Sequence, residues 1–434
     1  MRMNDMILVS VDDHIVEPPD LFKGRVPSKF KGREPVIRIA ENNAEHWFFE
    51  GIQLRNIGLN AVAGRVKSEY GWEPSAFEQM REGTYQHAKR IEDMNADGVL
   101  AQCNFPSFPG YCGKLFLEID DKELAIAVLQ AYNDWHIDEW CGSHPGRFIP
   151  MALVPMWDVN LAVQEAKRIA AKGVHAISFS ENPSAYGLPT FHSGYWDPLW
   201  KVCCDNAIVV NMHIGSGGGM HHPSPESPID VAITTMPVTL FNCASDLVFS
   251  PVLRQFPDLK MALSEGGTGW VPHFLERADY VYKQHSEWTH QDFGDILPSD
   301  TFKRSIITCF ISDEMGVKYR DDMNVDMMTW ESDYPHSDSP WPRSPENLWE
   351  YMKDVPDDVI NKITHENAMR EYNLDSFSIL GRENCTVGAL REKAKASGVD
   401  TTRVSYAAGV PPKDDDAVRP ITATDIARQT SGSM

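Results

Sequence analysis

The sequence lacks the features that mark a thiolate zinc protein, a secreted protein or a membrane protein. Its eight cysteines include no CxxC pair, which argues against a thiolate zinc site and a thioredoxin-like motif. The first residues, MRMNDMILVSVDDH, have no long apolar region followed by a small-residue cleavage site. No apolar run approaches the length of a membrane span. We therefore expect a cytoplasmic protein with reduced thiols and no membrane partner.

Clusters of basic residues are also missing. The chain has 40 Lys and Arg against 62 Asp and Glu, a net charge of −22, and its acidic residues are spread along the sequence. Such a field disfavours nucleic acid and anionic lipid surfaces, which reward clustered positive charge. An anionic substrate remains compatible with it, because a bound cation can reverse the local potential. We expect a small-molecule substrate, no nucleic-acid partner and a homo-oligomer.

The length of 434 residues suits one large α/β barrel. Eight short apolar segments recur, and their nearly continuous apolar character is typical of parallel strands covered on both faces. These segments are Ile7–Asp12, Gly98–Asn104, Arg147–Pro155, Gly173–Glu181, Ala207–Gly215, Asp258–Glu265, Ser305–Ile311 and Asp326–Asp333.

Helical patterns lie between several of these strands. Asn160–Lys172 is amphipathic and is followed by Gly173, a common helix stop. Further helices are predicted at Lys122–Trp140, Trp196–Cys204 and Asp357–Tyr372. The alternation predicts an α/β fold, a (β/α)₈ TIM-like barrel, although an open doubly wound sheet could give a similar pattern.

Two connections are too long for simple loops. Residues 15–95 follow the first strand and are expected to form a lid or an interface, and residues 266–304 follow the sixth. We place the barrel domain at residues 1–375. Residues 376–434 form a polar C-terminal extension, whose last part is expected to be flexible or to wrap around a partner.

Chemistry concentrates at the C-terminal ends of the strands, where barrel enzymes build their sites. The first strand ends in Asp12-Asp13-His14, the fifth in His213, and the eighth in Asp333. Asp12 and His14 are two residues apart, so in a strand they share a face, while Asp13 points outwards. Two imidazoles and two carboxylates form a donor set that suits Zn²⁺, Mn²⁺ or Fe²⁺.

These residues resemble the amidohydrolase superfamily, and more narrowly its branch of metal-dependent hydrolases and decarboxylases related to aminocarboxymuconate-semialdehyde decarboxylase. The similar blocks are DDHIVEPPDLF, YWDPLW, HIGSG, FPDLKMALSEGGTGWVPHFLERAD, SDYPHSD and HENAMREYNL, across roughly residues 6–375. The resemblance implies that Asp12, His14, His213 and Asp333 are metal ligands, with zinc as the first choice of ion and manganese or iron as alternatives.

The sequence departs from the superfamily pattern at three strands. Asp12 stands where many members have the first His of an HxH pair. The fourth strand, Gly173–Glu181, has no Lys to bridge two metals. Glu265 stands on the sixth strand where relatives often place a catalytic His.

Other polar residues near the strand ends have more than one interpretation. Glu265 is a base, a further metal ligand or an anchor for the turn after it. His336 supports the ligands from behind, faces the substrate or lies on the surface, and Glu17 is a further ligand or only ends its strand before two prolines. Asp333, Glu265 and His336 are the candidate proton carriers. His222, in a loop expected to overhang the mouth, and Trp270 are assigned to substrate binding.

Three functions follow from this site. The first is a mononuclear hydrolase or non-oxidative decarboxylase that acts on a small carboxylate or carbonyl substrate. The second is a dinuclear non-haem iron or manganese oxygenase, with Glu17, Glu265 and His336 completing a second metal site. The third is a non-catalytic partner subunit, which the retained ligand set argues against.

Overall fold

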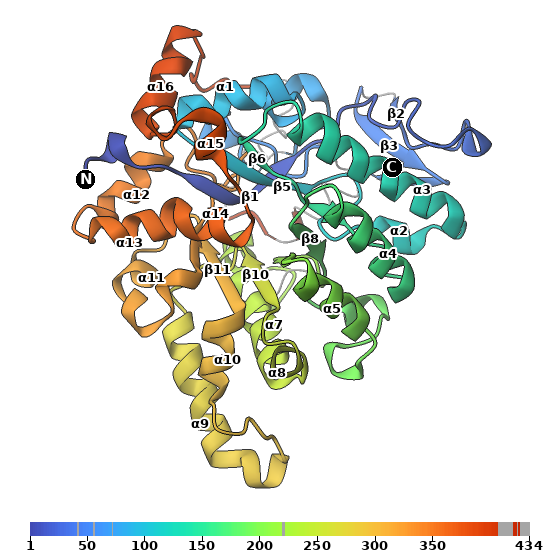
Figure 1. The fold of residues 1–434 in the computed structure, drawn as a ribbon. Helices are drawn as coiled ribbons and strands as arrows, with labels where there is room; N and C mark the ends of the chain where they lie inside the picture. Colours follow the sequence, from blue (N-terminus) through green and yellow to red (C-terminus); the bar gives the residue numbers. More distant parts are fainter. Residues whose placement is uncertain are drawn as a thin grey trace.

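The computed structural model describes residues 1–40, 43–54, 57–71, 73–218, 222–406, 420–422 and 424–425. A nine-stranded parallel sheet forms its centre (Figure 1), in the order β6-β5-β1-β12-β11-β10-β9-β8-β7. The strands are β1 (Val9–Ile15), β5 (Ala101–Pro106), β6 (Phe148–Ile149), β7 (Ala152–Leu153), β8 (Ala176–Phe179), β9 (Val209–His213), β10 (Lys260–Ser264), β11 (Ile306–Phe310) and β12 (Met328–Trp330).

The two edge strands of this order are two halves of one segment. β6 pairs with β5 and β7 pairs with β8, and only Pro150 and Met151 separate them. Pro150 has no N–H to donate to a ladder, which interrupts the pairing there. The strand order is therefore the cyclic order of the predicted (β/α)₈ barrel and not that of an open doubly wound sheet.

Helices surround the strands on the outside (Figure 1). They are α1 (His87–Asp97), α2 (Leu115–Glu118), α3 (Lys122–Asp134), α4 (Val159–Ala170), α5 (Asp197–Asp205), α6 (Ile229–Thr235), α7 (Pro237–Phe249), α8 (Val252–Gln255), α9 (Val271–Thr289), α10 (Pro298–Ser305), α11 (Glu314–Lys318), α12 (Ser344–Met352), α13 (Asp357–Asn361), α14 (Asn367–Glu371), α15 (Ser376–Leu380) and α16 (Val387–Ala396).

The helix α4 shows why the periodicity of the sequence predicted this helix correctly. Its N-cap Asp158 accepts hydrogen bonds from the backbone N–H groups of Asn160 and Leu161. Ala166 and Ile169, three residues apart, are buried against the sheet. The predicted helix over 357–372 is also present, as α13 and α14 joined by a π-helical turn.

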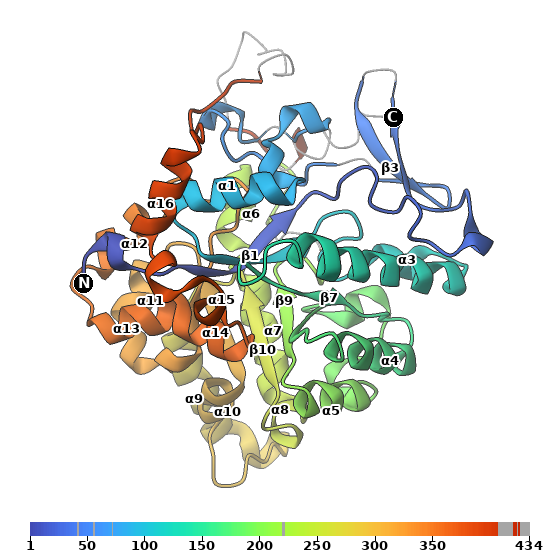
Figure 2. The ribbon, with the colours of Figure 1, turned by 45° about the horizontal axis from the view of Figure 1, so that its top comes forward.

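The long connection after β1 forms a small antiparallel sheet of β2 (Val36–Ile39), β3 (Glu45–Phe49) and β4 (Ile52–Leu54). Figure 2 shows β3 standing apart from the barrel strands. Trp47 of β3 packs on Phe108, in the loop after β5, with ring centroids 4.8 Å apart. The insertion therefore covers part of the barrel mouth, and its last segment, α1, is one of the barrel's own helices.

The second long connection contains α9 and α10, and Figure 1 shows α9 projecting away from the barrel. Tyr280 and Trp288 of α9 are exposed. This connection lies on the outside of the barrel, and nothing in the described residues brings its exposed aromatic rings to the strand ends.

One helical stretch, Ile229–Phe249, is long and apolar enough to cross a membrane by length and composition. The prediction that no run approaches such a length is wrong on that criterion. One helix of this kind is weak support for a span, since core helices of soluble proteins pass the same test. The expectation of no membrane partner stays a prediction.

The start of the C-terminal extension is packed on the barrel domain. Val387 and Leu390 of α16 are buried and belong to the hydrophobic core, and Val387 lies against Gly98 at the end of α1. Further on, the N–H of Val404 donates to the carbonyl of Gly64 in the first insertion. Residues 407–419, part of the tail expected to be flexible, lie outside the described residues.

We expect Leu390→Ala to lower the free energy of unfolding by about 2 to 5 kcal/mol, because it removes a buried side chain and leaves a cavity under α16. Urea denaturation of the full chain measures this, with the exposed Lys395→Ala in the same helix as the control. Equal stability of the two variants would contradict the docking of α16.

Candidate metal centre

Polar side chains from separate strands meet at one end of the barrel. Asp12 and His14 lie on β1, His213 is the last residue of β9, and Asp333 follows β12. The turn after β12 is held to β1, since the N–H of Asp333 donates to the carbonyl of Asp12 and the N–H of His14 donates to the carbonyl of Tyr334. The structure thus brings the four predicted ligands together.

The distances within this cluster are short and similar. His14 Nε2 lies 3.5 Å from Asp12 Oδ1 and 3.2 Å from Asp333 Oδ1. His213 Nε2 lies 3.5 Å from Asp12 Oδ2 and 3.2 Å from His14 Nε2. Ligands about 2.1 Å from a shared ion stand about 3.0 to 3.5 Å apart in octahedral or tetrahedral arrangements. The separations therefore fit donors around one divalent ion.

Hydrogen bonding leaves these donors available. Both carboxylate oxygens of Asp12 are buried without a hydrogen-bond partner among the described residues, and those of Asp333 have only side chains of the same cluster, His336 and Glu265, as polar neighbours. His213 Nδ1 lies 2.6 Å from the carbonyl oxygen of Ile214, and donation there leaves the Nε2 lone pair facing the cluster. Buried carboxylates without donors are costly, and a bound cation would remove that cost.

The shifted pKa values of the cluster also support a metal site. Burial, together with the neighbouring carboxylates, raises the pKa of Asp12 well above its usual range. Burial lowers the pKa of His213 to about 3 and that of His14 well below its usual value. Neutral imidazoles are the form that ligates metals, and a dication would favour the ionised carboxylates.

Glu265 and His336 join the edge of the cluster. Glu265 Oε2 lies 3.2 Å from His213 Nε2, and its side chain keeps 10% exposure, whereas that of Asp333 keeps 1%. His336 Nδ1 lies 2.9 Å from Asp333 Oδ1, and its ring stacks on His14 with centroids 3.7 Å apart. The structure supports a position at the site for His336 and not on the surface.

Asp13 is a site residue that the sequence pattern did not identify. It points away from the ligand cluster, as its alternation with Asp12 predicts, but it is fully buried. Its Oδ1 accepts hydrogen bonds from Ser332 Oγ at 2.7 Å, from the Tyr334 N–H at 3.1 Å and from Gln102 Nε2 at 3.0 Å. Asp13 therefore fixes the turn that carries Asp333.

Glu331 performs a similar task for Glu265. Its Oε2 accepts the backbone N–H of Glu265 at 3.2 Å. Glu265 has φ +60° and Asp333 has φ +53°, in the left-handed region that non-glycine residues rarely adopt. A buried carboxylate thus accepts a hydrogen bond from Glu265 itself and another accepts hydrogen bonds from the turn that carries Asp333. No local sequence signal marks such tertiary contacts.

Glu17 is not placed as a metal ligand, which corrects that prediction. Its two carboxylate oxygens accept the N–H groups of Ser107 at 3.0 Å and Phe108 at 2.7 Å. The carboxylate therefore anchors the loop after β5.

The two predicted substrate-binding residues make their contacts outside the ligand cluster. Trp270 Nε1 donates to the carbonyl of Gly266, and the ring packs on Phe241 and Phe274 of the outer helices, so it stabilises helix packing. His222 is exposed and its Nδ1 lies 3.1 Å from the carbonyl oxygen of Ser224 in its own loop. Its neighbour His221 lies outside the described residues.

The fourth barrel strand, β8, carries no lysine, as the sequence predicted. Among the described residues, two groups of potential metal ligands are found, and they share His14. One contains Asp12, His14 and His213, and the other contains His14, Asp333 and His336. Because the groups share a ligand, they describe one centre.

Comparison with known proteins identifies the family to which this architecture corresponds. The sequence profile of the amidohydrolase family matches residues 64–374. A 2-amino-3-carboxymuconate-6-semialdehyde decarboxylase from Dictyostelium discoideum is 23% identical over 308 residues, which are 69% of this chain and 80% of that protein.

Two solved structures share the fold. An amidohydrolase from Mycobacterium avium subsp. paratuberculosis K-10 has a TM-score of 0.63 and 19% identity, covering 84% of this chain and 99% of that one. A 5-carboxyvanillate decarboxylase from Novosphingobium aromaticivorans DSM 12444, complexed with manganese and 4-hydroxy-3-methoxy-5-nitrobenzoic acid, has a TM-score of 0.58 and 15% identity, covering 86% and 100%.

The family profile spans more than half of the chain and includes three of the strands whose ends build the site. The Dictyostelium relative and the two solved structures agree with it. This chain belongs to the amidohydrolase family.

Proposed function

We propose that this protein is a mononuclear, divalent-metal-dependent decarboxylase that acts without an oxidant on a small unsaturated or aromatic carboxylate. The observation that carries the proposal is the buried set of Asp12, His14, His213 and Asp333, in which both oxygens of Asp12 have no hydrogen-bond partner among the described residues. The decarboxylases among its relatives support the reaction class. Hydrolysis at the same centre is the alternative within the family.

The bound ion would act as a Lewis acid that holds the substrate carboxylate and an adjacent oxygen. Loss of CO₂ breaks the bond between the carboxylate carbon and its neighbour, and the electron pair stays on that neighbouring carbon. A proton must then reach this carbon, and the protein must supply it.

Glu265 is the proton donor that the geometry favours. It stands beside His213, and its side chain is partly exposed, so it can face a substrate. Burial and the neighbouring Asp333 raise the pKa of Glu265 well above its usual range, which favours the protonated form that a proton donor needs. After the transfer, the carboxylate regains its proton from water.

Two other functions from the sequence analysis receive less support. The dinuclear oxygenase needed Glu17 in a second metal site, but that carboxylate is engaged by two backbone N–H groups. A non-catalytic subunit would not need the assembled donor set. One metal per chain and CO₂ release without oxygen consumption would exclude both.

Zinc, from the sequence analysis, stays a proposal beside manganese, the ion held by the carboxyvanillate decarboxylase structure. Protein stripped with a chelator is reloaded with Zn²⁺, Mn²⁺ or Fe²⁺ and tested for CO₂ release from 5-carboxyvanillate and 2,6-dihydroxybenzoate. Cytoplasmic location and a homo-oligomer also stay predictions, which cell fractionation and light scattering measure.

We expect His213→Ala to weaken metal binding at least about a hundredfold. The substitution removes a ligand whose ring is oriented by the hydrogen bond between its Nδ1 and the carbonyl oxygen of Ile214. Elemental analysis after dialysis measures the retained metal. The matched control is His192→Ala, an exposed histidine paired with Asp246 on the outside of the barrel. Full metal retention by the folded His213→Ala variant would show that the ligand assignment is wrong.

Glu265→Gln should lower kcat by about 10²- to 10⁴-fold while one metal per chain is retained, since it removes the proton but keeps the shape of the side chain. Glu276→Gln on α9, an exposed site, is the control. If turnover persisted in Glu265→Gln and disappeared in His336→Ala, the donor would be the histidine.

Asp13→Ala should lower metal affinity by about 10- to 100-fold, because the turn that holds Asp333 loses its two hydrogen bonds to Asp13. Asp13→Asn should recover most of this loss, since its amide oxygen can still accept from Ser332 and Tyr334. Metal titration measures both, with Asp205→Ala on α5 as the control. Unchanged affinity in Asp13→Ala would contradict a positioning role.

A further inference from the structure

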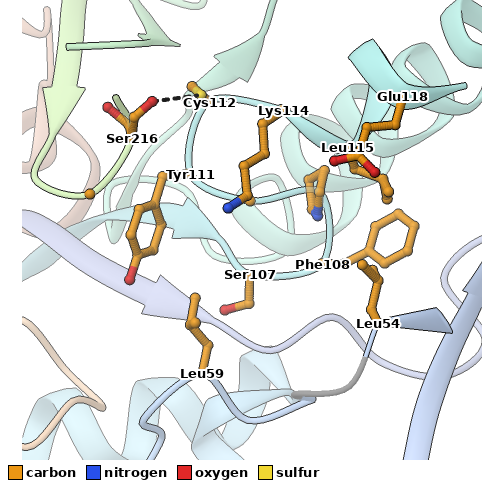
Figure 3. Close-up of a pocket in the computed structure, with 13 residues that line it drawn as sticks. Leu54, Leu59, Ser107, Phe108, Tyr111, Cys112, Lys114, Leu115, Glu118 and Ser216 are labelled. Carbon is orange, nitrogen blue, oxygen red and sulfur yellow. Dashed lines mark hydrogen bonds between the residues drawn. The ribbon is translucent and has the colours of Figure 1, made fainter. Parts of the chain in front are cut away.

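One arginine is buried beside the metal centre and outside the cavity that adjoins it. The cavity has a volume of about 300 Å³, and its wall is formed mostly by the loop after β5, Ser107–Leu115, with Leu54 of the first insertion (Figure 3). Tyr111 borders it on the ligand side, since its ring centroid lies 4.0 Å from that of His213. Arg90 of α1 is 0% exposed and is not one of the described residues that line the cavity. Arg90 can therefore act on the ligands, but it cannot touch a molecule in the cavity.

The guanidinium of Arg90 holds the backbone of a metal ligand. Its Nη2 donates a hydrogen bond to the carbonyl oxygen of His14. The N–H of His14 donates in turn to the carbonyl of Tyr334 at 2.7 Å, and Arg90 Cζ lies 4.6 Å from the centroid of the Tyr334 ring. Arg90 thus contacts both sides of the junction between β1 and the turn that carries Asp333.

A second path leads from Arg90 to Asp13. Arg90 Nη1 donates to Gln102 Oε1 at 3.1 Å, and Gln102 Nε2 donates to Asp13 Oδ1 at 3.0 Å. Because arginine can only donate hydrogen bonds, the amide oxygen of Gln102 must face it and the amide nitrogen must face Asp13. Arg90 therefore fixes the side chain that holds Asp13, the carboxylate to which the Asp333 turn is attached.

The remaining donors of Arg90 bind the end of the first insertion. Its Nε donates to the carbonyl of Gly83 at 2.6 Å, and its Nη2 lies 3.5 Å from the carbonyl oxygen of Thr84. The same carbonyl of Thr84 accepts the N–H of Val16, just after β1, at 3.1 Å. The hydrogen-bond acceptors of Arg90 are thus neutral oxygens. An apolar side chain could fill this volume at a lower electrostatic cost, which indicates that the planar set of donors is what the site requires.

We propose that Arg90 is a positioning residue of the metal centre, which holds the main chain of His14 directly and Asp13 through Gln102. The proposal rests on the proposed function in taking the ligand cluster as the site of a divalent ion. Metal–ligand distances tolerate errors of only about 0.2 Å, so loss of these supports should weaken metal binding. The positive charge of Arg90 by itself acts in the opposite direction, because it repels a cation. Positioning and charge therefore predict opposite effects of removing Arg90.

Two substitutions separate positioning from charge. Arg90→Lys keeps the charge but loses the planar fork of donors, and Arg90→Met loses both. We expect each to weaken Mn²⁺ binding by about 10- to 100-fold, as measured by calorimetry on the full-length protein after removal of metal with a chelator.

The matched control is Arg147→Lys, which should keep the wild-type affinity. Arg147 is also buried, and its Nε and Nη2 donate to the carbonyls of Leu100 and Val99. These residues precede β5, so they lie at the end of the barrel opposite the ligands. The absorption spectrum of bound Co²⁺, which reports ligand geometry, should change in Arg90→Lys and stay the same in Arg147→Lys. Thermal denaturation checks that each variant is folded.

The path through Gln102 has its own test. Gln102→Leu breaks the link to Asp13 and leaves the contact with His14, so it should weaken Mn²⁺ binding less than Arg90→Lys does. The double variant should bind about as weakly as Arg90→Lys alone, because the same path can be lost only once. Additive losses in the double variant would refute this path.

Wild-type affinity in folded Arg90→Lys, equal losses in Arg90→Lys and Arg147→Lys, or tighter Mn²⁺ binding by Arg90→Met would overturn the proposal. Its failure can be told apart from that of the proposed function. CO₂ release by the wild type with no effect of Arg90 on metal affinity refutes this inference alone. Weaker metal binding in the Arg90 variants, without CO₂ release by the wild type from any carboxylate tested, refutes the reaction and leaves the positioning role in place.

Discussion

The buried carboxylates at one end of the barrel are the constraint on which the rest of the structure depends, because their burial costs electrostatic free energy. Asp12 and Asp333 are fully buried, and neither oxygen of Asp12 accepts a hydrogen bond among the described residues. A divalent ion beside the neutral imidazoles of His14 and His213 removes this cost and gives the cluster a function.

The parts of the chain around this centre serve to hold it and to limit access to it. Asp13 fixes the turn that carries Asp333, and Glu17 fixes the loop that carries Tyr111. The first insertion supplies Leu54 to the opposite wall of the cavity. The barrel thus provides the ligands, whereas the loops and the insertion decide which molecule reaches them.

Much of the fold could be predicted from the sequence. Burial on one or both faces dictates how apolar residues are spaced in strands and helices, and this spacing is visible in the local sequence. It therefore predicted all eight barrel strands. Their ends showed Asp12, His14, His213 and Asp333, because charged residues are unusual after buried strands. The break of the third strand at Pro150, and the docking of α16 through Leu390, depend on partners far along the chain and were not predicted.

What the sequence by itself determined is the kind of centre: the barrel, the donor set and the absence of a bridging lysine, all of which follow from residue types at strand ends. Tertiary structure decided the roles of single carboxylates. Glu17, Asp13 and Glu265 are chemically alike and all near strand ends, yet one anchors a loop, one holds a turn and one stands beside the ligands. The role of a buried carboxylate depends on which donors surround it, and long-range packing alone places those donors.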